Sequence, residues 1–311
     1  MYDLIIIGAG PAGLSAAIYA ARAKMDAVIV EEKAVGGQIL NTLEIENYPG
    51  SDLEESGPSL MEKMKKQIEY FKVQVINARA DEVYLNESIK KIRLSTGETL
   101  EAKSIIVATG ASPRKLNCKG EQEFTGRGVS YCATCDADFF NGLEVIVVGG
   151  GNTAVEEAIY LTRFAKKVTV LVRADKLRAD RLAEEKAREI ENLHFKFNTS
   201  LAEIKGEGFV KSVILRDNKT GEESIYESED GLLGVFVFVG TSPHTDIFKG
   251  KLELNEDGYI IADKDMKTDI SGVFAAGDVR NTNLRQVVTA VSDGAIAAVQ
   301  AQKYIDSLAL E

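Results

Sequence analysis

Two cysteines three positions apart are the residues of this chain best suited to chemistry. Cys132 and Cys135 have the C-x-x-C spacing, which serves as half of a zinc site or as a redox pair. Zinc needs a second pair of ligands, and only Cys118 and two distant histidines, His194 and His244, remain. We therefore expect no metal site and interpret the pair as thiols that form and break a disulfide, one serving as nucleophile when its pKa is lowered.

Asp136 directly follows this pair. A carboxyl group there could protonate a leaving thiolate or take a proton from an attacking thiol. The structural alternative is that its side chain caps a helix or a turn, a frequent role of aspartate. Cys118 has no partner at a suitable spacing, so we interpret it as a small apolar residue.

A glycine-rich turn near the start of the chain predicts a dinucleotide site. An apolar strand at 4–7 leads into the turn, and apolar residues at helical spacing follow. The first glycine allows a tight turn, the second lets the backbone approach a pyrophosphate, and the third allows close helix packing. A following strand ends in a carboxylate near the spacing expected for binding a ribose hydroxyl, roughly 20 residues on. The residues of this prediction are Gly8, Gly10, Pro11, Ala12 and Gly13 in the turn and Glu31 and Glu32 at the strand end.

The same plan occurs again about 140 residues later. A strand at 145–148 leads into a turn that contains Gly149, Gly151, Asn152, Thr153 and Ala154. Here the next strand ends on an apolar residue in place of a carboxylate, and two arginines follow. The guanidinium groups could pair with the 2′-phosphate of NADPH or could be solvated surface charges. These residues are Val172, Arg173 and Arg178.

Composition limits the classes of protein that fit. A chain of 311 residues with 45% apolar residues allows about two domains. The net charge of −11 argues against a nucleic-acid partner, and no apolar run reaches the ~18–20 residues of a membrane span. Three cysteines are too few for a disulfide-stapled secreted scaffold, and the opening strand has no signal-peptide pattern. We expect a cytoplasmic protein.

Two strand–turn–helix–strand units predict an α/β fold with two Rossmann-like, three-layer dinucleotide-binding domains; that the second is inserted into the first follows only from the family resemblance given below. Further strands that lead into glycine turns are expected at 104–107, 235–239 and 273–276. Helices are expected at 58–71, 179–191 and 287–308.

With these motifs in place, the chain resembles the low-molecular-weight, bacterial-type thioredoxin reductases, which are FAD-dependent class II pyridine nucleotide-disulfide oxidoreductases. The resemblance covers essentially the whole chain and rests on motifs in the family's order. They are Gly-Ala-Gly-Pro-Ala-Gly at 8–13, Gly-Gly-Gln at 36–38, Glu-Asn-Tyr-Pro-Gly at 46–50, Ala-Thr-Gly at 108–110, Cys-Ala-Thr-Cys-Asp at 132–136, Gly-Gly-Gly-Asn-Thr-Ala at 149–154, Gly-Asp-Val at 277–279 and Arg-Gln-Val at 285–287.

The resemblance implies a discontinuous FAD-binding domain at 1–113 and 245–311, and a pyridine-nucleotide-binding domain at 114–244 that carries the cysteines. The first glycine turn and Glu31 would hold the ADP half of FAD. Further FAD-binding residues implied by the matching motifs are Gly36, Gly37, Gln38, Asn47, Ala108, Thr109, Gly110, Gly277, Asp278, Arg285, Gln286 and Val287.

The resemblance also implies a reaction. A donor reduces FAD, and two electrons pass to the Cys132–Cys135 disulfide, with Cys135 next to the flavin. Cys132 then attacks the disulfide of thioredoxin or a thioredoxin-like protein, with Asp136 as the acid/base. Members of the family rotate one domain against the other and work as homodimers.

The donor site departs from the family pattern. NADPH-dependent members show His-Arg-Arg and a further arginine four residues on; here Val172 and Ala174 replace the histidine and the middle arginine. The donor is therefore NADPH held by fewer contacts, NADH, or reduced ferredoxin as in some relatives.

Three other functions are weighed. The flavoprotein component of a peroxide-reducing system would carry an extra N-terminal redox region, whereas this chain opens on the FAD strand. A ferredoxin–NADP reductase of similar fold would lack the cysteine pair. A non-catalytic nucleotide-binding redox sensor would not need C-x-x-C beside a dinucleotide site.

Overall fold

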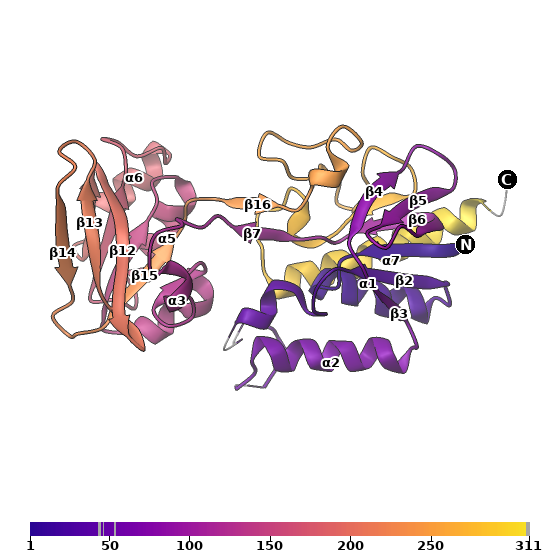
Figure 1. The fold of residues 1–311 in the computed structure, drawn as a ribbon, viewed down its shortest axis with the longest axis horizontal. Helices are drawn as coiled ribbons and strands as arrows, with labels where there is room; N and C mark the ends of the chain where they lie inside the picture. The colour runs from indigo at the N-terminus through magenta and orange to yellow at the C-terminus, as the bar shows by residue number, and fades with distance from the viewer. Residues whose placement is uncertain (43–44, 46, 53, 309–311) are drawn as a thin grey trace. The chain divides into compact units, whose positions relative to one another are not determined.

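The computed structural model describes residues 1–42, 45, 47–52 and 54–308, and the chain forms two compact units (Figure 1). The first unit is Met1–Ser112 with Ser242–Glu311, and the second is Pro113–Thr241. The chain passes between them slightly before the predicted positions, 113 and 244, because each passage falls inside a short strand, β7 (Ala111–Pro113) or β16 (Thr241–Pro243), and these strands pair. Residues 309–311 and Glu46, which belong to the predicted FAD domain, lie outside the described residues.

A seven-stranded sheet forms the centre of the first unit. Its strands are β1 (Tyr2–Ile7), β2 (Ala27–Glu31), β3 (Gln74–Asn77), β4 (Ala80–Tyr84), β5 (Lys90–Leu94), β6 (Thr99–Val107) and β17 (Val273–Ala275). The order is β3-β2-β1-β6-β5-β4, and β17 also pairs with β6. The β3-β2-β1-β6-β17 part is parallel, whereas β4, β5 and β6 pair antiparallel. The parallel part is the Rossmann-like core that the first glycine turn requires.

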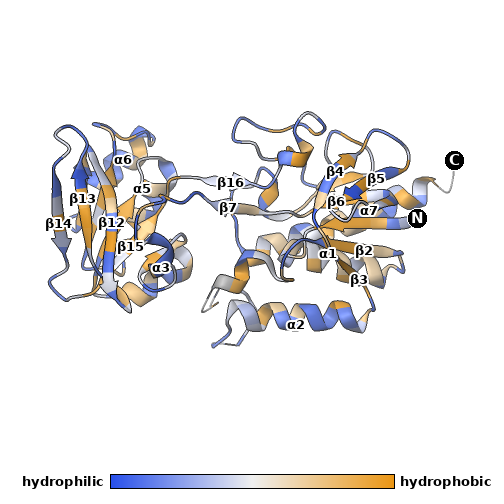
Figure 2. Cartoon of the chain, viewed as in Figure 1, coloured by the Kyte–Doolittle hydropathy of each residue, from blue (hydrophilic) through white to orange (hydrophobic). Residues whose placement is uncertain are grey.

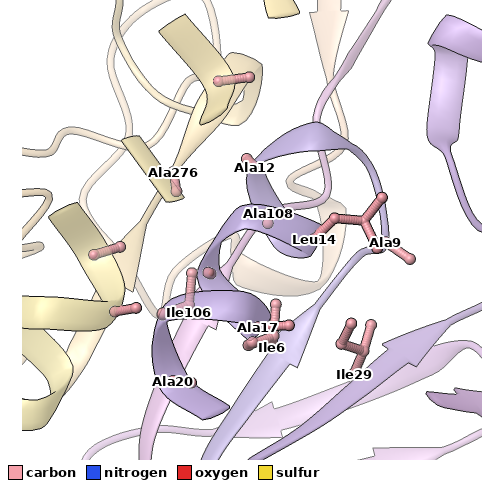
Figure 3. Close-up of a cluster of buried hydrophobic side chains, with 14 of the residues drawn as sticks. Ile6, Ala9, Ala12, Leu14, Ala17, Ala20, Ile29, Ile106, Ala108 and Ala276 are labelled. Carbon is pink, nitrogen blue, oxygen red and sulfur yellow. The ribbon is translucent and has the colours of Figure 1, made fainter. Parts of the chain in front are cut away.

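Helices cover one face of this sheet. They are α1 (Pro11–Arg22), α2 (Gly57–Tyr70) and α7 (Val287–Leu308). Figure 3 shows Leu14 and Ala17 of α1 over Ile6 and Ile106 of the strands, all of them buried. Because side chains alternate along a strand, Ile5 faces the opposite side, where it packs with β4, β5 and residues 248–262. The parallel part of the sheet therefore lies between a helical layer and a second layer, formed by residues 248–262 and by β4 and β5, which continue the same sheet in antiparallel pairing.

The second unit repeats this layered plan. Its parallel sheet contains β8 (Val129–Ser130), β9 (Glu144–Val148), β10 (Lys167–Val172), β11 (Leu193–Phe197) and β15 (Leu233–Val237), in the order β11-β10-β9-β15-β8. One face packs with α4 (Ala133–Asp136), α5 (Asn152–Leu161) and α6 (Arg181–Arg188). The other face packs with α3 (Glu121–Phe124) and an antiparallel sheet of β12 (Thr199–Glu207), β13 (Phe209–Asp217) and β14 (Glu223–Glu227).

Hydropathy follows these layers. In Figure 2 the inner strands of both units are hydrophobic, and α2 alternates hydrophobic with hydrophilic residues along its length. Helix α6 is shorter than the predicted 179–191 at both ends. It begins after Asp180, whose backbone N–H donates to Asn152 Oδ1 at 2.7 Å, and it ends at Arg188. Among the described residues, no helix is long and apolar enough to cross a membrane.

Candidate active site

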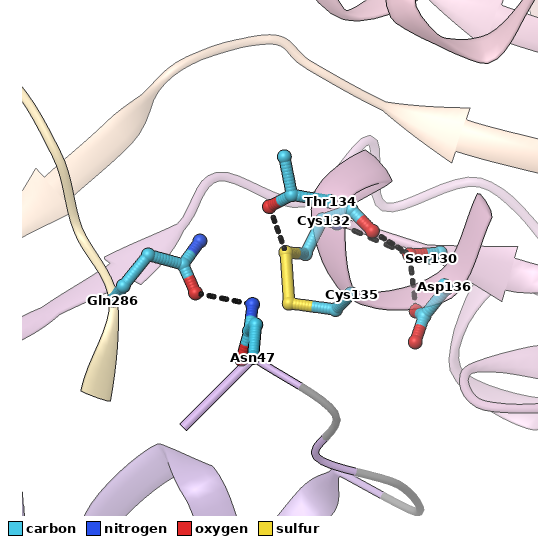
Figure 4. The surroundings of a disulfide bond; sticks show 7 residues. All are labelled: Asn47, Ser130, Cys132, Thr134, Cys135, Asp136 and Gln286. Carbon is cyan, nitrogen blue, oxygen red and sulfur yellow. Dashed lines mark hydrogen bonds between the residues drawn. A yellow bond between two sulfur atoms is a disulfide. The ribbon is translucent and has the colours of Figure 1, made fainter. Parts of the chain in front are cut away.

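The two motif cysteines form a disulfide. Cys132 and Cys135 are bonded with their Cα atoms 5.3 Å apart (Figure 4). Helix α4 begins directly after Cys132, so one short helical turn sets the spacing of the two sulfurs. Thr134 Oγ1 lies 3.4 Å from Cys132 Sγ, a contact the sequence analysis did not anticipate. The arrangement is a redox pair, as the motif predicted.

Asp136 does not cap a helix. It occupies the N-cap position of the 3₁₀ helix η2 (Ala137–Phe140), but its side chain makes no capping hydrogen bond there. Instead Asp136 Oδ2 accepts a hydrogen bond from Ser130 Oγ at 2.5 Å. Burial raises the pKa of Asp136 above its usual range, and the bond from Ser130 opposes that rise. A half-buried carboxyl group with a raised pKa is a candidate for general acid/base chemistry.

A second carboxylate anchors the chain just before the cysteines. Glu121 is buried and accepts hydrogen bonds from the backbone N–H groups of Leu116 and Asn117 and from the hydroxyl of Tyr131. Cys118 lies in the same segment and packs against the core of the unit. Burial, with the charge of Glu121, raises the pKa of the Cys118 thiol to about 11. Cys118 is therefore an unreactive thiol, consistent with its interpretation as an apolar residue.

The second glycine turn lies next to the redox helix in the same unit. Helix α5 starts at this turn and packs on α4, with Ala133 among Ala154 and Ala158. A Cβ on Gly149 would come within 2.4 Å of Phe238 O, whereas one on Gly151 would have no atom within 4 Å. The turn thus packs tightly at its base and is open at the position where a phosphate would approach.

The segment after β10 presents the two predicted arginines. Arg173 and Arg178 are both exposed, and in the described part of the chain neither guanidinium has a hydrogen bond or an ion pair with protein. Val172 is buried beneath Gly150, where a carboxylate would be needed to bind a ribose hydroxyl. Asn152 Nδ2 donates to Asp180 Oδ2 at 2.7 Å, and Thr153 is exposed beside it.

The first glycine turn is built more tightly. A Cβ on Gly8 would lie 2.3 Å from Ala108 O, and one on Gly13 would lie 1.9 Å from Gly8 O. A Cβ on Gly10 would meet nothing within 4 Å. Glu31 accepts the backbone N–H of Ala9 at 2.7 Å and that of Lys33 at 2.8 Å. The carboxylate thus holds the turn as well as marking the strand end, whereas Glu32 points to Arg79.

Several of the other predicted FAD residues lie around this turn. Gly36 N–H donates to Ala9 O at 2.8 Å, and a Cβ on Gly37 would lie 3.2 Å from Gly10 Cα. A Cβ on Gly277 would lie 2.9 Å from the Cβ of Ala12, which follows Pro11 in α1. Gln38 is exposed on the 3₁₀ helix η1 (Gly37–Asn41).

A second group lies beyond the turn. Asn47 Nδ2 donates to Gln286 Oε1 at 3.2 Å (Figure 4), just before Val287 opens α7. Thr109 Oγ1 donates to His244 O, and Gly110 O accepts the His244 N–H. The sequence analysis gave His244 no role, and it lies against the Ala-Thr-Gly segment.

Two side chains of the first unit fit a bound flavin nucleotide. Arg285 lies over the ring of Tyr259 at 4.2 Å, and its Nε is buried without a hydrogen-bond partner among the described residues. Burial raises the pKa of Asp278 to about 6, with Asp293 adding to the rise and Arg285 opposing it. Buried polar groups of this kind are normally satisfied by a ligand or water. Together with the open space at Gly10, these two side chains offer the polar groups and the backbone approach that a dinucleotide such as FAD requires.

Comparison with known proteins agrees with this geometry. The pyridine nucleotide-disulphide oxidoreductase family model matches residues 2–294. The chain belongs to this family. It is 54% identical over 309 residues to thioredoxin reductase of Peptoclostridium acidaminophilum, covering 99% of this chain and 98% of that protein, and 53% identical to thioredoxin reductase of Peptoclostridium litorale, covering 100% and 99%.

Solved structures give the same result. The crystal structure of thioredoxin reductase from Streptococcus pyogenes superposes with a TM-score of 0.93, at 44% identity and 99% coverage of both chains. The predicted resemblance and the α/β fold class with two Rossmann-like domains are confirmed. The family uses FAD and pyridine nucleotides.

Proposed function

We propose that this protein is a flavin-dependent thioredoxin-disulfide reductase. The observation that carries the proposal is the Cys132–Cys135 disulfide, formed on a helix that packs against the helix of the second glycine turn. Full-length relatives at 54% and 53% identity are thioredoxin reductases. A non-catalytic sensor would require neither the disulfide nor a half-buried acid next to it in the chain.

The residues divide the work in the following way. When bound, FAD supplies a two-electron carrier between the donor and the disulfide. The first glycine turn and Glu31 would hold its ADP half, and Asn47, Asp278, Arg285 and Gln286 would lie nearer the flavin. In this scheme Cys135 faces the flavin.

Cys132 is proposed as the thiol that attacks the partner. Its attack on the partner disulfide forms a mixed disulfide and releases one partner thiolate, which takes up a proton. Cys135 then displaces the second partner sulfur and restores the Cys132–Cys135 bond. Asp136 is the proposed proton carrier for these steps, supported by its raised pKa.

We propose NADPH as the electron donor. The support is the missing carboxylate at the end of β10 together with the two exposed, unpaired guanidinium groups of Arg173 and Arg178. With Val172 and Ala174 in place of a histidine and an arginine, discrimination against NADH should be weaker than at a four-cation site. NADH and reduced ferredoxin are the alternative outcomes of the test.

The partner and the setting complete the proposal. Thioredoxin or a thioredoxin-like disulfide protein is the proposed substrate, and a homodimer is the proposed assembly. A cytoplasmic location is proposed because thiol-reducing systems keep that compartment free of disulfides.

Two measurements test this function. Cys135→Ser should abolish thioredoxin reduction while leaving flavin absorbance intact, and Cys118→Ser is the matched control that should keep full activity. Full activity in Cys135→Ser would overturn the mechanism. Anaerobic flavin bleaching with NADPH, NADH and reduced ferredoxin, each offered alone, identifies the donor, and bleaching by ferredoxin only would refute the nucleotide site.

A further inference from the structure

The hydroxyl of Ser130 lies at the centre of the contacts around the redox pair (Figure 4). Its oxygen is 2.5 Å from Asp136 Oδ2, 3.1 Å from the Cys132 backbone N and 3.2 Å from the Cys132 carbonyl O. A serine hydroxyl has one proton to donate and two lone pairs with which to accept. It therefore cannot donate to Asp136 and to the Cys132 carbonyl at the same time.

The two choices correspond to two protonation states of Asp136. When Asp136 is ionised, Ser130 donates to its carboxylate and accepts the Cys132 N–H. When Asp136 is protonated, its O–H can donate to Ser130, and the hydroxyl proton turns to the Cys132 carbonyl. The Cys132 carbonyl also accepts the backbone N–H of Asp136 at 3.3 Å, so it keeps a partner in both arrangements, and Ser130 neither gains nor loses a proton.

We propose that Ser130 is a positioning residue that serves both protonation states of Asp136 and ties that carboxyl group to the backbone of Cys132. The inference rests on the proposed function, in which Asp136 exchanges protons with thiols. In Figure 4 the sulfurs and the Asp136 carboxyl group project to different sides of α4, and Ser130 links the carboxyl group to the backbone of Cys132. Ser130 is itself buried, so water does not easily replace its hydroxyl.

Apart from burial, the hydrogen bond from Ser130 is the main influence on the pKa of Asp136. The titratable groups on the elements beside α4 are Tyr131 before it, Asp138 of η2, and Glu156, Glu157 and Tyr160 of α5. None of these has a hydrogen bond or ion pair with Asp136 within the described ranges. The pKa of Asp136 is set by burial, which raises it, and by the Ser130 bond, which lowers it. Burial and the charge of Glu156 raise the pKa of Glu157.

The pH profile of the reduced holoenzyme tests this inference. The alkylation rate of Cys132 by iodoacetamide and the rate of thioredoxin reduction would be followed from about pH 5 to 9, across the range in which perturbed carboxyl groups titrate. Ser130→Ala removes the bond to the carboxylate, so the inflection due to Asp136 should move to higher pH by about one unit. Ser130→Thr, which keeps the hydroxyl, should restore the original profile. Ser224→Ala, on an exposed strand of the same unit, is the matched control and should change nothing.

The outcomes separate this inference from the proposed function. In Asp136→Asn the inflection should disappear, and adding Ser130→Ala should then cause no further shift. A uniform loss of rate in Ser130→Ala with an unmoved inflection, or a shift that persists in the Asp136→Asn background, would overturn the role of Ser130 alone. If the inflection assigned to Asp136 remained in Asp136→Asn, both the role of Ser130 and the assignment of Asp136 would be overturned. Flavin absorbance reports folding of each variant.

Discussion

The two glycine turns share a sequence plan but are stabilised in different ways. In the first, the carboxylate of Glu31 accepts two backbone N–H groups and fixes the turn from the end of the neighbouring strand. In the second, buried Val172 takes the equivalent place, and the turn is held from outside by Asn152, Asp180 and the N–H of Arg178, which donates to Gly150 O at 2.7 Å. The first turn fits a tightly held cofactor, and the second fits a substrate that enters and leaves.

The largest effect is expected from filling the closest approach in the first turn. Gly13→Ala would place a Cβ 1.9 Å from Gly8 O, a backbone atom that cannot move aside, and should lower the free energy of unfolding by about 3 kcal/mol or more. Gly10→Ala has open space, so it should stay within about 1 kcal/mol of wild type and yet lose FAD. Urea unfolding and flavin retention measure both, and equal destabilisation by the two variants would contradict the tight-packing account.

Substituting the one glycine in each turn that has open space around it should show that the two turns bind different ligands. Gly151→Ala, the counterpart of Gly10→Ala, should keep FAD fully bound and instead raise the KM for the pyridine nucleotide, because its Cβ would occupy the phosphate approach. Flavin content and steady-state kinetics give the two readouts. Loss of FAD from this variant would mean that the turns are not specialised as described.

Removing the polar groups that hold each turn should have unequal effects. Glu31→Ala removes two charge-assisted hydrogen bonds and should cost about 2 kcal/mol along with weaker FAD binding. Asn152→Ala removes two hydrogen bonds with Asp180 at an exposed site, where water can replace them, and should cost about 1 kcal/mol or less. Thermal unfolding of matched variants tests the difference, and a reversed order would refute it.

Charge pairing at the second turn should be specific to the 2′-phosphate. Arg173→Ala and Arg178→Ala should each raise the KM for NADPH by about tenfold while leaving the KM for NADH unchanged. Arg181→Ala is the control, since Arg181 already pairs with Glu185 at 2.8 Å. Equal changes for both nucleotides would show that these arginines are ordinary surface charges.

The last prediction concerns Asp278 and depends on pH. Its pKa is about 6 in the folded protein, above the ordinary 3.8, because burial disfavours the ionised carboxylate. The folded state is therefore most stable, as far as Asp278 is concerned, below pH 3.8, and this stability is lost as the pH rises through 6. In flavin-free protein, Asp278→Asn should therefore gain stability over wild type above about pH 6, by on the order of 1–3 kcal/mol. Exposed Asp306→Asn should show no such gain, and a pH-independent difference for Asp278→Asn would contradict the shift.

Residue patterns predicted the strands whose signal lies within a few consecutive residues. Short apolar runs identified β1, β9 and β10, because parallel strands buried on both faces are apolar along their length, and glycine turns after β1 and β9 supported the first two. The antiparallel sheet β12–β14 was missed: its strands mix charged and apolar residues, and its register is fixed by contact with the second unit's core. The start of helix α6 was predicted two residues too early because the bond between Asp180 and Asn152 joins residues that periodicity does not connect.

In the candidate active site, too, sequence patterns found residues that are neighbours in the chain and missed contacts that only the fold creates. Cys132, Cys135 and Asp136 were identified because their chemistry lies in adjacent residues. Glu121 was missed because its role depends on hydrogen-bond donors that only the folded chain brings to its carboxylate. Ser130 lay two residues before the motif, but only the fold shows that its hydroxyl meets both Asp136 and the Cys132 backbone.

The central claim is that the Cys132–Cys135 disulfide accepts electrons through FAD. An anaerobic reductive titration of the flavin absorbance tests it most directly, because flavin and disulfide each take up two electrons. Wild type should consume about four electrons per chain, and Cys135→Ser about two. Equal consumption by the two proteins would show that the cysteine pair is not in electronic contact with the flavin and would contradict the account.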